Sequence, residues 1–442
     1  MSITTRRIYF ASLLLFFTLA APLLIYYSRG WRFDIGTKKI VLTGTLSITT
    51  DPAGVSLSLD DKNIGRSPIK AMRVAPANYM VKFSKEGYFS REQPLDIEEG
   101  KAAVLNKVDL FKSESSRNRV LTGDISLFTE SPDKKYRASI LHTLSGDTLM
   151  IQKKPDTPFE PFGNFAPQSV SSIVWSPDAA SLVIETKLDA RREFSLATLA
   201  SRQLQSILTT SDEKIQILWD QNDGSRLYVK NGDTISLFGT KSVYTLPGNT
   251  LSLLIQGKKG FFLVERDNKT IELITRGLNE SVESETVIQD KLPLSREAAL
   301  SAHRDYMIIT DPTNNLLYVF RASISKPALF YQASSVTFAE WQFDQDALLF
   351  GNDHALHLLG QDGTDRVVVR YADIIHSPTW IYKKNLALLI HNGFVTVADL
   401  NYSPAVTLEL FPFDAATIST DESGKYMFLV TPQEVTGIQI SN

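Results

Sequence analysis

The sequence predicts an all-β protein behind one N-terminal transmembrane helix, with a small antiparallel β-sandwich followed by a larger, repetitive β-domain. Three observations predict this class. An uncharged apolar segment of twenty residues lies close to the N-terminus. Short runs that alternate apolar and polar residues then fill a stretch of about 65 residues. A tryptophan-centred pattern follows and recurs about every 40 residues up to the C-terminus.

Bulk composition bounds the class of protein. A chain of 442 residues is too long for one small core, so two or more domains are expected. Hydrophobic residues make up 43%, which is enough for the part beyond the apolar segment to fold. The formal net charge of −3 argues against a nucleic acid as the main partner. The absence of cysteine excludes a disulfide scaffold, thiolate zinc sites and a cysteine nucleophile.

Residues 8–27 are predicted to cross a membrane, with residues 1–7 as a short tail before them. The segment holds no charge, and at about 1.5 Å per residue a helix of this length spans about 30 Å. The alternative is a cleaved signal peptide, for which Leu19-Ala20-Ala21 offers small residues. The apolar run continues past Ala21 and is longer than the core of a typical signal peptide, so we expect an uncleaved anchor.

The sequence gives conflicting indications of the orientation of this segment in the membrane. Positive residues are more numerous on the C-terminal side, which by itself would place that side in the cytoplasm. They are Arg6 and Arg7 before the segment, and Arg29, Arg32, Lys38 and Lys39 after it, in the juxtamembrane residues 28–43. The Arg-Arg start is typical of an export signal, and a β-rich body is common among envelope proteins. We therefore expect a single-pass protein of the cell membrane, with a cytoplasmic N-terminus and an extracytoplasmic body.

Residues 44–111 are predicted to form the small antiparallel β-sandwich. Clusters of turn residues, such as Asp51-Pro52-Ala53-Gly54 and the hairpin tip 60–63, separate five short alternating runs. The runs are marked by Leu46 and Ile48; Val55, Leu57 and Leu59; Tyr79, Val81 and Phe83; Leu95 and Ile97; and Val104 and Val108. Short period-2 runs bounded by turns are typical of such a sandwich.

The same stretch resembles a PEGA domain. That family is named for a Pro-Glu-Gly-Ala turn before a β-strand, and it has a later Gly-x-Thr-Pro turn, a Pro-Gly-x-Tyr strand entry and a Gly-Tyr pair. The chain retains Pro52, Gly54, Gly65, Pro68, Pro76, Tyr79, Gly87 and Tyr88. It departs with Ala53 for Glu, Val55 for Ala, Ser67 for Thr and Ala77 for Gly. The resemblance implies a membrane-anchored or surface protein in which this domain is a spacer or a surface-binding module, with no catalytic residue to carry over.

A polar linker at residues 112–118 is predicted to lead into a β-propeller formed by residues 119–442. A period of about 40 residues with strand-turn-strand content indicates one four-stranded blade per repeat. Tryptophan marks four of the repeats, at Trp175, Trp219, Trp341 and Trp380, and weaker copies begin at Phe128, Leu254, Leu300 and Ile418. The tryptophans are interpreted as core residues wedged between blades.

Eight blades are favoured, with seven as the alternative because the copies near Leu254 and Leu300 are weak. The Ser-Pro-Asp turns at 131–133 and 176–178 resemble the TolB-type propeller repeat, and the pattern is similar to the WD repeat at lower fidelity. The last repeat has only three strands. We therefore expect Arg119-Val120-Leu121 to supply the missing outer strand and to close the ring.

No residue is predicted to be catalytic, to hold a cofactor or to bind a metal. His354 and His357 are three apart in an expected strand, so their side chains point to opposite faces and cannot chelate one ion. The sequence holds no His-Glu-x-x-His, no Gly-x-Ser-x-Gly and no phosphate-binding glycine loop. Residues 280–297 are the best candidate for a long loop between blades that contacts a partner. The acidic clusters are interpreted as solvated hairpin tips; they are Asp60-Asp61, Glu283-Glu285 and Asp344-Asp346.

The expected function is that of a non-enzymatic, membrane-anchored protein of a bacterial cell envelope whose propeller is an interaction platform. The expected partners are the membrane, through the anchor, and a protein or a cell-wall glycan, through the propeller. The alternative is an envelope enzyme of lyase or glycosidase type with its active site in the propeller channel. That alternative requires carboxylate, histidine or tyrosine side chains that converge near the axis, and the repeats show no ionisable residue at a repeated position.

Overall fold

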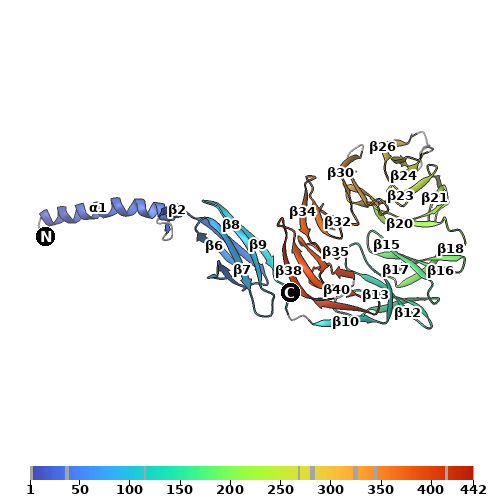
Figure 1. The fold of residues 1–442 in the computed structure, drawn as a ribbon, viewed down its shortest axis with the longest axis horizontal. Coiled ribbons are helices and arrows are strands. Elements are labelled where there is room, and N and C mark those ends of the chain that lie inside the picture. Colours follow the sequence, from blue (N-terminus) through green and yellow to red (C-terminus); the bar gives the residue numbers. More distant parts are fainter. Residues whose placement is uncertain are drawn as a thin grey trace. The chain divides into compact units, whose positions relative to one another are not determined.

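A computed structural model of the chain shows one helix followed by β-strands (Figure 1). It describes residues 3–34, 39–113, 116–266, 269–278, 284–321, 327–342, 346–413 and 417–441. The chain divides into two compact units, residues 1–115 with 440–442, and residues 116–439. Each unit has its own buried apolar clusters, and the all-β class predicted from the sequence is confirmed.

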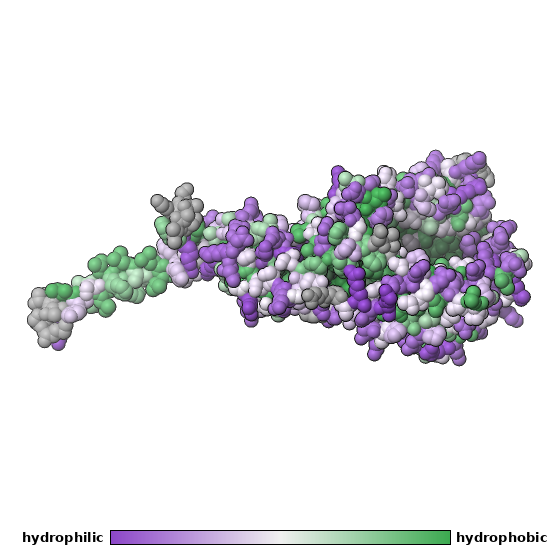
Figure 2. Space-filling view, turned by 60° about the horizontal axis from the view of Figure 1, so that its bottom comes forward, coloured by the Kyte–Doolittle hydropathy of each residue, from purple (hydrophilic) through white to green (hydrophobic). Residues whose placement is uncertain are grey.

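The first unit begins with helix α1, Ile3–Ser28. Within it, residues 8–28 are long and apolar enough to cross a membrane, although a signal sequence near an N-terminus has the same properties. Figure 2 shows the apolar surface of this helix, and none of the 8–28 segment is buried. The juxtamembrane segment holds an antiparallel hairpin that we did not predict, made of β1 (Trp31–Asp34) and β2 (Lys39–Leu42).

Two sheets follow and form the predicted sandwich. One has the order β6-β3-β9, with β3 at Gly44–Asp51, β6 at Ile69–Val74 and β9 at Ala102–Asp109. The other has the order β5-β4-β7-β8, with β4 at Ser56–Leu59, β5 at Lys62–Arg66, β7 at Ala77–Ser84 and β8 at Arg91–Ile97. Most of the residues predicted to face the core do so, since Leu46, Ile48, Leu57, Val81 and Phe83 are almost completely buried. The prediction is wrong for Val104 on β9, which is 60% exposed.

One pairing departs from the antiparallel arrangement that we expected. Strands β3 and β9 pair in parallel, with Thr45 opposite Ala102 and Asp51 opposite Asp109. A parallel pair needs a long crossover connection. Here strands β4 to β8 provide it, because the chain crosses to the other sheet for β4 and β5, returns for β6, and crosses again for β7 and β8 before β9.

The second unit is a β-propeller whose described strands form eight groups of four. The first group consists of β11 (Asp124–Glu130), β12 (Arg137–Thr143), β13 (Gly146–Gln152) and β14 (Glu160–Phe165), and the second of β15 (Val170–Trp175), β16 (Ser181–Leu188), β17 (Arg191–Thr198) and β18 (Gln203–Thr210). The third group consists of β19 (Gln216–Asp220), β20 (Asp223–Asn231), β21 (Thr234–Leu237) and β22 (Val243–Thr245). The fourth consists of β23 (Thr250–Gln256), β24 (Lys259–Glu265), β25 (Ile271–Gly277) and β26 (Thr286–Leu292). The third and fourth groups are joined by a parallel bridge between Asp220 and Ile255.

The remaining groups complete the unit. They are β27 (Ala299–His303), β28 (Tyr306–Asp311), β29 (Leu316–Arg321), β30 (Ala328–Ser334); β31 (Phe338–Trp341), β32 (Leu348–Asn352), β33 (Ala355–Leu359), β34 (Asp365–Arg370); β35 (Ile375–Ile381), β36 (Leu386–His391), β37 (Phe394–Asp399), β38 (Val406–Pro412); and β39 (Thr417–Thr420), β40 (Tyr426–Val430), β41 (Glu434–Gln439), β10 (Arg117–Thr122). This order favours eight blades over seven.

The last group confirms the predicted closure of the ring. Strand β10 pairs antiparallel with β41, so the outer strand of the last blade comes from the start of the unit. Val120 and Leu121 are buried in a cluster with Phe428 and Val435 of the same blade. Strand β10 begins at Arg117, inside the segment that we predicted to be a linker.

The Ser-Pro-Asp motifs form the turn between the first and second strands of two blades. Ser131 Oγ donates to Asp133 Oδ1 at 2.8 Å and accepts the backbone N–H of Tyr136 at 2.9 Å. Ser176 and Asp178 repeat the first of these bonds at 2.6 Å. The fourth residue of each turn has a positive φ, 57° at Lys134 and 60° at Ala179. Because a lysine and an alanine share this conformation, the turn, and not the type of side chain, determines the backbone angle.

The repeated tryptophans lie in the blade cores, as predicted. Trp175, Trp219 and Trp380 are at most 8% exposed, and Trp341 is half-buried. The Trp380 indole N–H donates to the carbonyl oxygen of Glu340, in the preceding blade, at 2.9 Å. The Trp219 indole N–H likewise donates to the Val174 carbonyl oxygen in the blade before it, at 3.4 Å, so these two tryptophans each tie their blade to the preceding one.

Candidate functional site: a charged pocket at the ends of the first strands

A pocket of about 380 Å³ opens where the first strands of several blades end. Its lining comes from β11, β27, β31, β35, β39 and the turn after β11. Aromatic residues such as Trp341 and Tyr382 supply much of the wall. Charged residues from distant parts of the sequence meet in it, namely Glu130, Lys134 and Glu340. We call these three residues, together with Arg137, the mouth cluster.

Lys134 is the centre of the mouth cluster. Its Nζ lies 3.3 Å from Glu340 Oε1 and 3.6 Å from Glu130 Oε2, and it lies 3.4 Å from Thr379 Oγ1. The Lys134 side chain is only 12% exposed. Its ammonium group therefore joins carboxylates on β11 and β31, which are more than 200 residues apart in sequence.

The two carboxylates have further partners that fix their positions. Glu340 accepts hydrogen bonds from the Thr379 hydroxyl and from the backbone N–H of Trp380, both at 3.3 Å. Glu130 accepts a hydrogen bond from the Ser419 hydroxyl on β39. Strands β11, β31, β35 and β39 therefore contribute to one connected network of polar groups.

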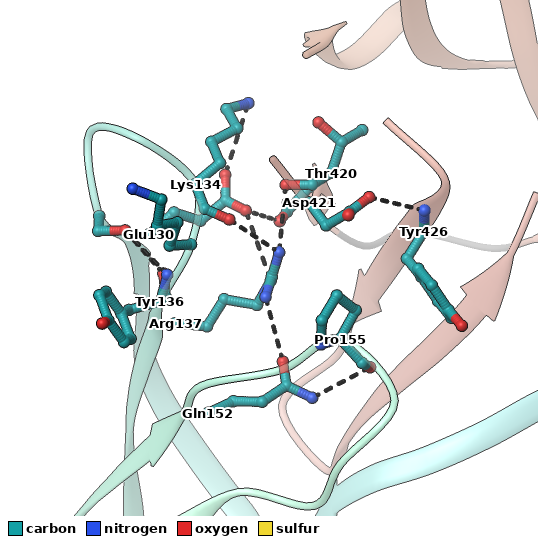
Figure 3. A network of polar contacts seen from close by, with 12 residues as sticks. Glu130, Lys134, Tyr136, Arg137, Gln152, Pro155, Thr420, Asp421 and Tyr426 are labelled. Atoms are coloured by element: carbon teal, nitrogen blue, oxygen red, sulfur yellow. Dashed lines mark hydrogen bonds and ion pairs between the residues drawn. The ribbon is translucent and has the colours of Figure 1, made fainter. Parts of the chain in front are cut away.

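The fourth member, Arg137, is fully buried. Its guanidinium lies 3.9 Å above the Phe428 ring, and its Nε is 3.8 Å from Glu130 Oε1. Figure 3 shows the donors of Arg137 directed toward Gln152 and toward backbone oxygens. The bond to the Lys134 carbonyl is 3.2 Å long, and that to Thr420 is 3.5 Å. Burial lowers the pKa of Arg137, while Glu130 opposes the shift, and a guanidinium keeps its charge in proteins.

Two members of the mouth cluster, Glu130 and Arg137, occupy the positions that hold an apolar pair in other blades. In the second blade Trp175 faces Leu182 across the first two strands, and in the third Trp219 faces Leu227. In the first blade the facing residues are Glu130 and Arg137. Facing residues of an antiparallel pair lie on the same side of the sheet, so an ion pair stands where the repeat has a tryptophan and a leucine.

The electrostatics of this pocket favour a fixed charge arrangement. Burial alone would lower the pKa of Lys134, but the carboxylates of Glu340 and Glu130 outweigh this effect and raise it above its ordinary value. The raised pKa favours the ammonium form of Lys134, the form that pairs with the two carboxylates. The cluster can bind a ligand at its rim, or hold the blades together, without any proton transfer.

The other candidates from the sequence have ordinary partners. Asp346 forms an ion pair with Arg304 at 3.3 Å, and Glu285 lies 3.4 Å from Arg276. His357 contacts Asp365 at 2.9 Å. Glu283 and Asp344 lie outside the described residues. Among the residues that the structure describes, no three His, Asp or Glu side chains are placed to hold a metal ion.

The prediction of a long loop at residues 280–297 is wrong for part of that range. Residues 286–292 form β26, the outer strand of its blade, which pairs with β25. Its exposed edge explains the polar composition that suggested a loop, while Leu292 is buried in the blade core. Residues 280–283 lie outside the described part of the chain.

The sequence search missed the mouth cluster, although one signal was present. Glu130-Ser131-Pro132-Asp133 aligns with Trp175-Ser176-Pro177-Asp178, and Arg137 aligns with Leu182. A buried position at which the repeat changes from apolar to charged is a departure of the kind that marks functional or strained sites. Glu340 gives no such signal, because only folding of the ring brings it next to its partner Lys134.

Comparisons with known proteins support parts of this description. Residues 43–108 match the PEGA domain family, which confirms the resemblance. No curated protein matches the chain. Three similar solved structures are an uncharacterized protein of Listeria monocytogenes (10% identity, 69% of this chain and 99% of that chain, TM-score 0.49), dipeptidyl peptidase 4 of Porphyromonas gingivalis (9%, 70% and 56%, 0.49) and TolB of Acinetobacter baumannii (14%, 67% and 60%, 0.32). At these TM-scores the likenesses carry no argument about function, and the propeller assignment depends on the strand order.

Proposed function

We propose that this chain is a non-enzymatic, membrane-anchored protein of the cell envelope whose propeller binds a partner. Helix α1 is the anchor, with the N-terminus in the cytoplasm and the body outside it. The PEGA domain is a spacer or a surface-binding module. The propeller's partner is a protein or a cell-wall glycan, recognised at the pocket lined by Glu130, Lys134 and Glu340 of the mouth cluster.

The pairing of the charges in this pocket is the observation that supports the proposal. A catalytic acid or base must change its protonation state near the working pH. Lys134 instead stays charged between Glu130 and Glu340, and these carboxylates are held by further hydrogen bonds. A rigid pocket with aromatic walls and a few fixed polar groups is typical of recognition sites.

A cross-linking experiment tests this function. A photo-reactive amino acid is placed at Thr417, which is exposed and lines the pocket, or at Lys241, which is exposed in the loop after β21 and does not line it. Intact cells are irradiated, and adducts are recovered from the membrane fraction. We expect one stoichiometric adduct from position 417 and none from position 241, because the pocket presents fixed charges and aromatic surface to the partner.

Three results would contradict the proposal. Adducts that are equally abundant at both positions would show that the pocket has no special role. A chain that is recovered outside the membrane fraction would show that α1 is not an anchor. Absence of any adduct would favour a spacer without a specific partner.

An enzyme remains the second candidate, because the structure brings two carboxylates to one pocket. Glu130 and Glu340 contact the same ammonium group, and paired carboxylates near the axis are what a channel glycosidase or lyase requires. We expect purified full-length protein to release no product from polysaccharide fragments of the cell's own envelope. Product release that Glu340→Gln abolishes, and that the surface variant Glu160→Gln leaves intact, would replace our proposal with the enzyme.

A further inference from the structure

The hairpin β1–β2 has one apolar face. Its register pairs Trp31 with Leu42 and Phe33 with Ile40. Facing residues of an antiparallel pair, and residues two apart in a strand, lie on the same side. These four residues therefore form a continuous apolar stripe, while Arg32 belongs to the opposite face. Phe33 is 62% exposed and Ile40 is 66% exposed.

This hairpin is a separate two-stranded sheet. It is paired with neither sheet of the sandwich. Two-stranded hairpins are at best marginally stable in water, unless another surface covers their apolar side. The exposed Phe33–Ile40 pair on such a hairpin therefore indicates that another apolar environment covers these two side chains in the functional protein.

The hairpin is attached to the last turn of α1. Only two residues separate Ser28 from Trp31. The rings of Tyr26 and Trp31 contact edge to face with centroids 6.1 Å apart. The Arg32 guanidinium lies 3.4 Å above the Tyr27 ring and donates to the Tyr27 carbonyl at 2.7 Å. If α1 spans the membrane, its last turn lies among the lipid headgroups, and these contacts hold β1 at the same depth.

We propose that the β1–β2 hairpin lies in the interfacial layer of the membrane, with Phe33 and Ile40 inserted between the lipid headgroups. This inference rests on the proposed anchor. The occupant is lipid because the apolar stripe continues from the apolar helix and because Tyr, Trp and Arg side chains, which suit the headgroup region, surround it. The hairpin is then a second membrane contact that restricts rotation of the chain about α1.

The absence of cysteine permits a clean test. Full-length Ile40→Cys is labelled with an environment-sensitive fluorophore and reconstituted into liposomes with or without lipids brominated close to the headgroup. The control is Leu144→Cys, an apolar and fully exposed position in the β12–β13 turn. We expect the brominated lipids to quench the label at position 40 by about twofold or more and to leave the label at position 144 unchanged.

Further measurements separate this proposal from that of the anchor. Adding Phe33→Ser to Ile40→Cys should reduce the quenching, because it removes Phe33, the remaining natural side chain of the exposed apolar pair. Alkaline extraction of the liposomes reports on α1 alone. Protein that resists extraction but whose label at position 40 is no more quenched than that at position 144 overturns the hairpin proposal and leaves the anchor standing. Quenching that is unchanged by Phe33→Ser also overturns it, and protein that alkali releases overturns both proposals.

Discussion

Replacing Glu130 with alanine is expected to destabilise the second unit by about 3–5 kcal/mol, because one partner of a buried charge network is removed. Arg137, which is fully buried, would lose its only carboxylate within 4 Å among the described residues, and Lys134 would keep only Glu340. The measurement is urea unfolding of the full-length protein, followed by the fluorescence of the blade tryptophans. A midpoint shift with an unchanged slope would report the stability loss.

A matched control separates burial from charge. Glu160 pairs with Arg202 at 3.3 Å, and both side chains are more than half exposed. Glu160→Ala should therefore cost at most about 1 kcal/mol, as exposed ion pairs usually do. Equal costs for the two alanine variants would show that the mouth cluster adds no special stability.

The reverse substitution tests whether the cluster is kept for stability. Glu130→Trp combined with Arg137→Leu restores the apolar pair found in the second and third blades. Replacing a buried ion pair with well-packed apolar residues is often neutral, or stabilising by about 1–4 kcal/mol. A double variant at least as stable as the natural protein, yet without the cross-link from position 417, would assign the cluster to recognition.

Much of the fold could be predicted from periodicity alone. Alternation identified the inward faces of the sandwich, because a strand buried on one side must place Leu46, Ile48, Val81 and Phe83 on that side. It could not reveal that β3 and β9 run in parallel, because alternation carries no information about strand direction. The hairpin β1–β2 was missed because its strands have only four residues each, beside a stronger membrane signal.

The weak repeats show why the blade count was ambiguous. The copies near Leu254 and Leu300 lack the tryptophan but still form β23–β26 and β27–β30. Phe261, Leu263 and Phe320 fill the shared core there, so apolar volume is kept while the marker residue is lost. Only part of the mouth cluster could be identified from the sequence. The change from an apolar to a charged pair in the first blade can be recognised there, but the contact with the carboxylate from β31 cannot.

Deletion of residues 117–123 is the second large expected effect, because it removes the strand that closes the ring. We expect the free energy of unfolding to fall by at least about 3–6 kcal/mol, because the burial of Val120 and Leu121 is lost and the apolar residues that they cover, such as Phe428 and Val435, become exposed. The unpaired edge of β41 should also promote association between chains. Thermal melting and sedimentation of the full-length variant measure the two effects, and melting like the natural protein would refute closure by β10.

A covalent closure at the same place should have the opposite effect. Asn118 and Gly437 face each other across β10 and β41. A Cβ at Gly437 would meet its nearest neighbours at 3.4–3.5 Å, so the backbone there accepts a Cβ without a clash. Because the chain has no other cysteine, Asn118→Cys with Gly437→Cys should form one disulfide and add about 2–4 kcal/mol. That gain should vanish with reductant, since cleavage of the disulfide removes the covalent link that holds β10 against β41.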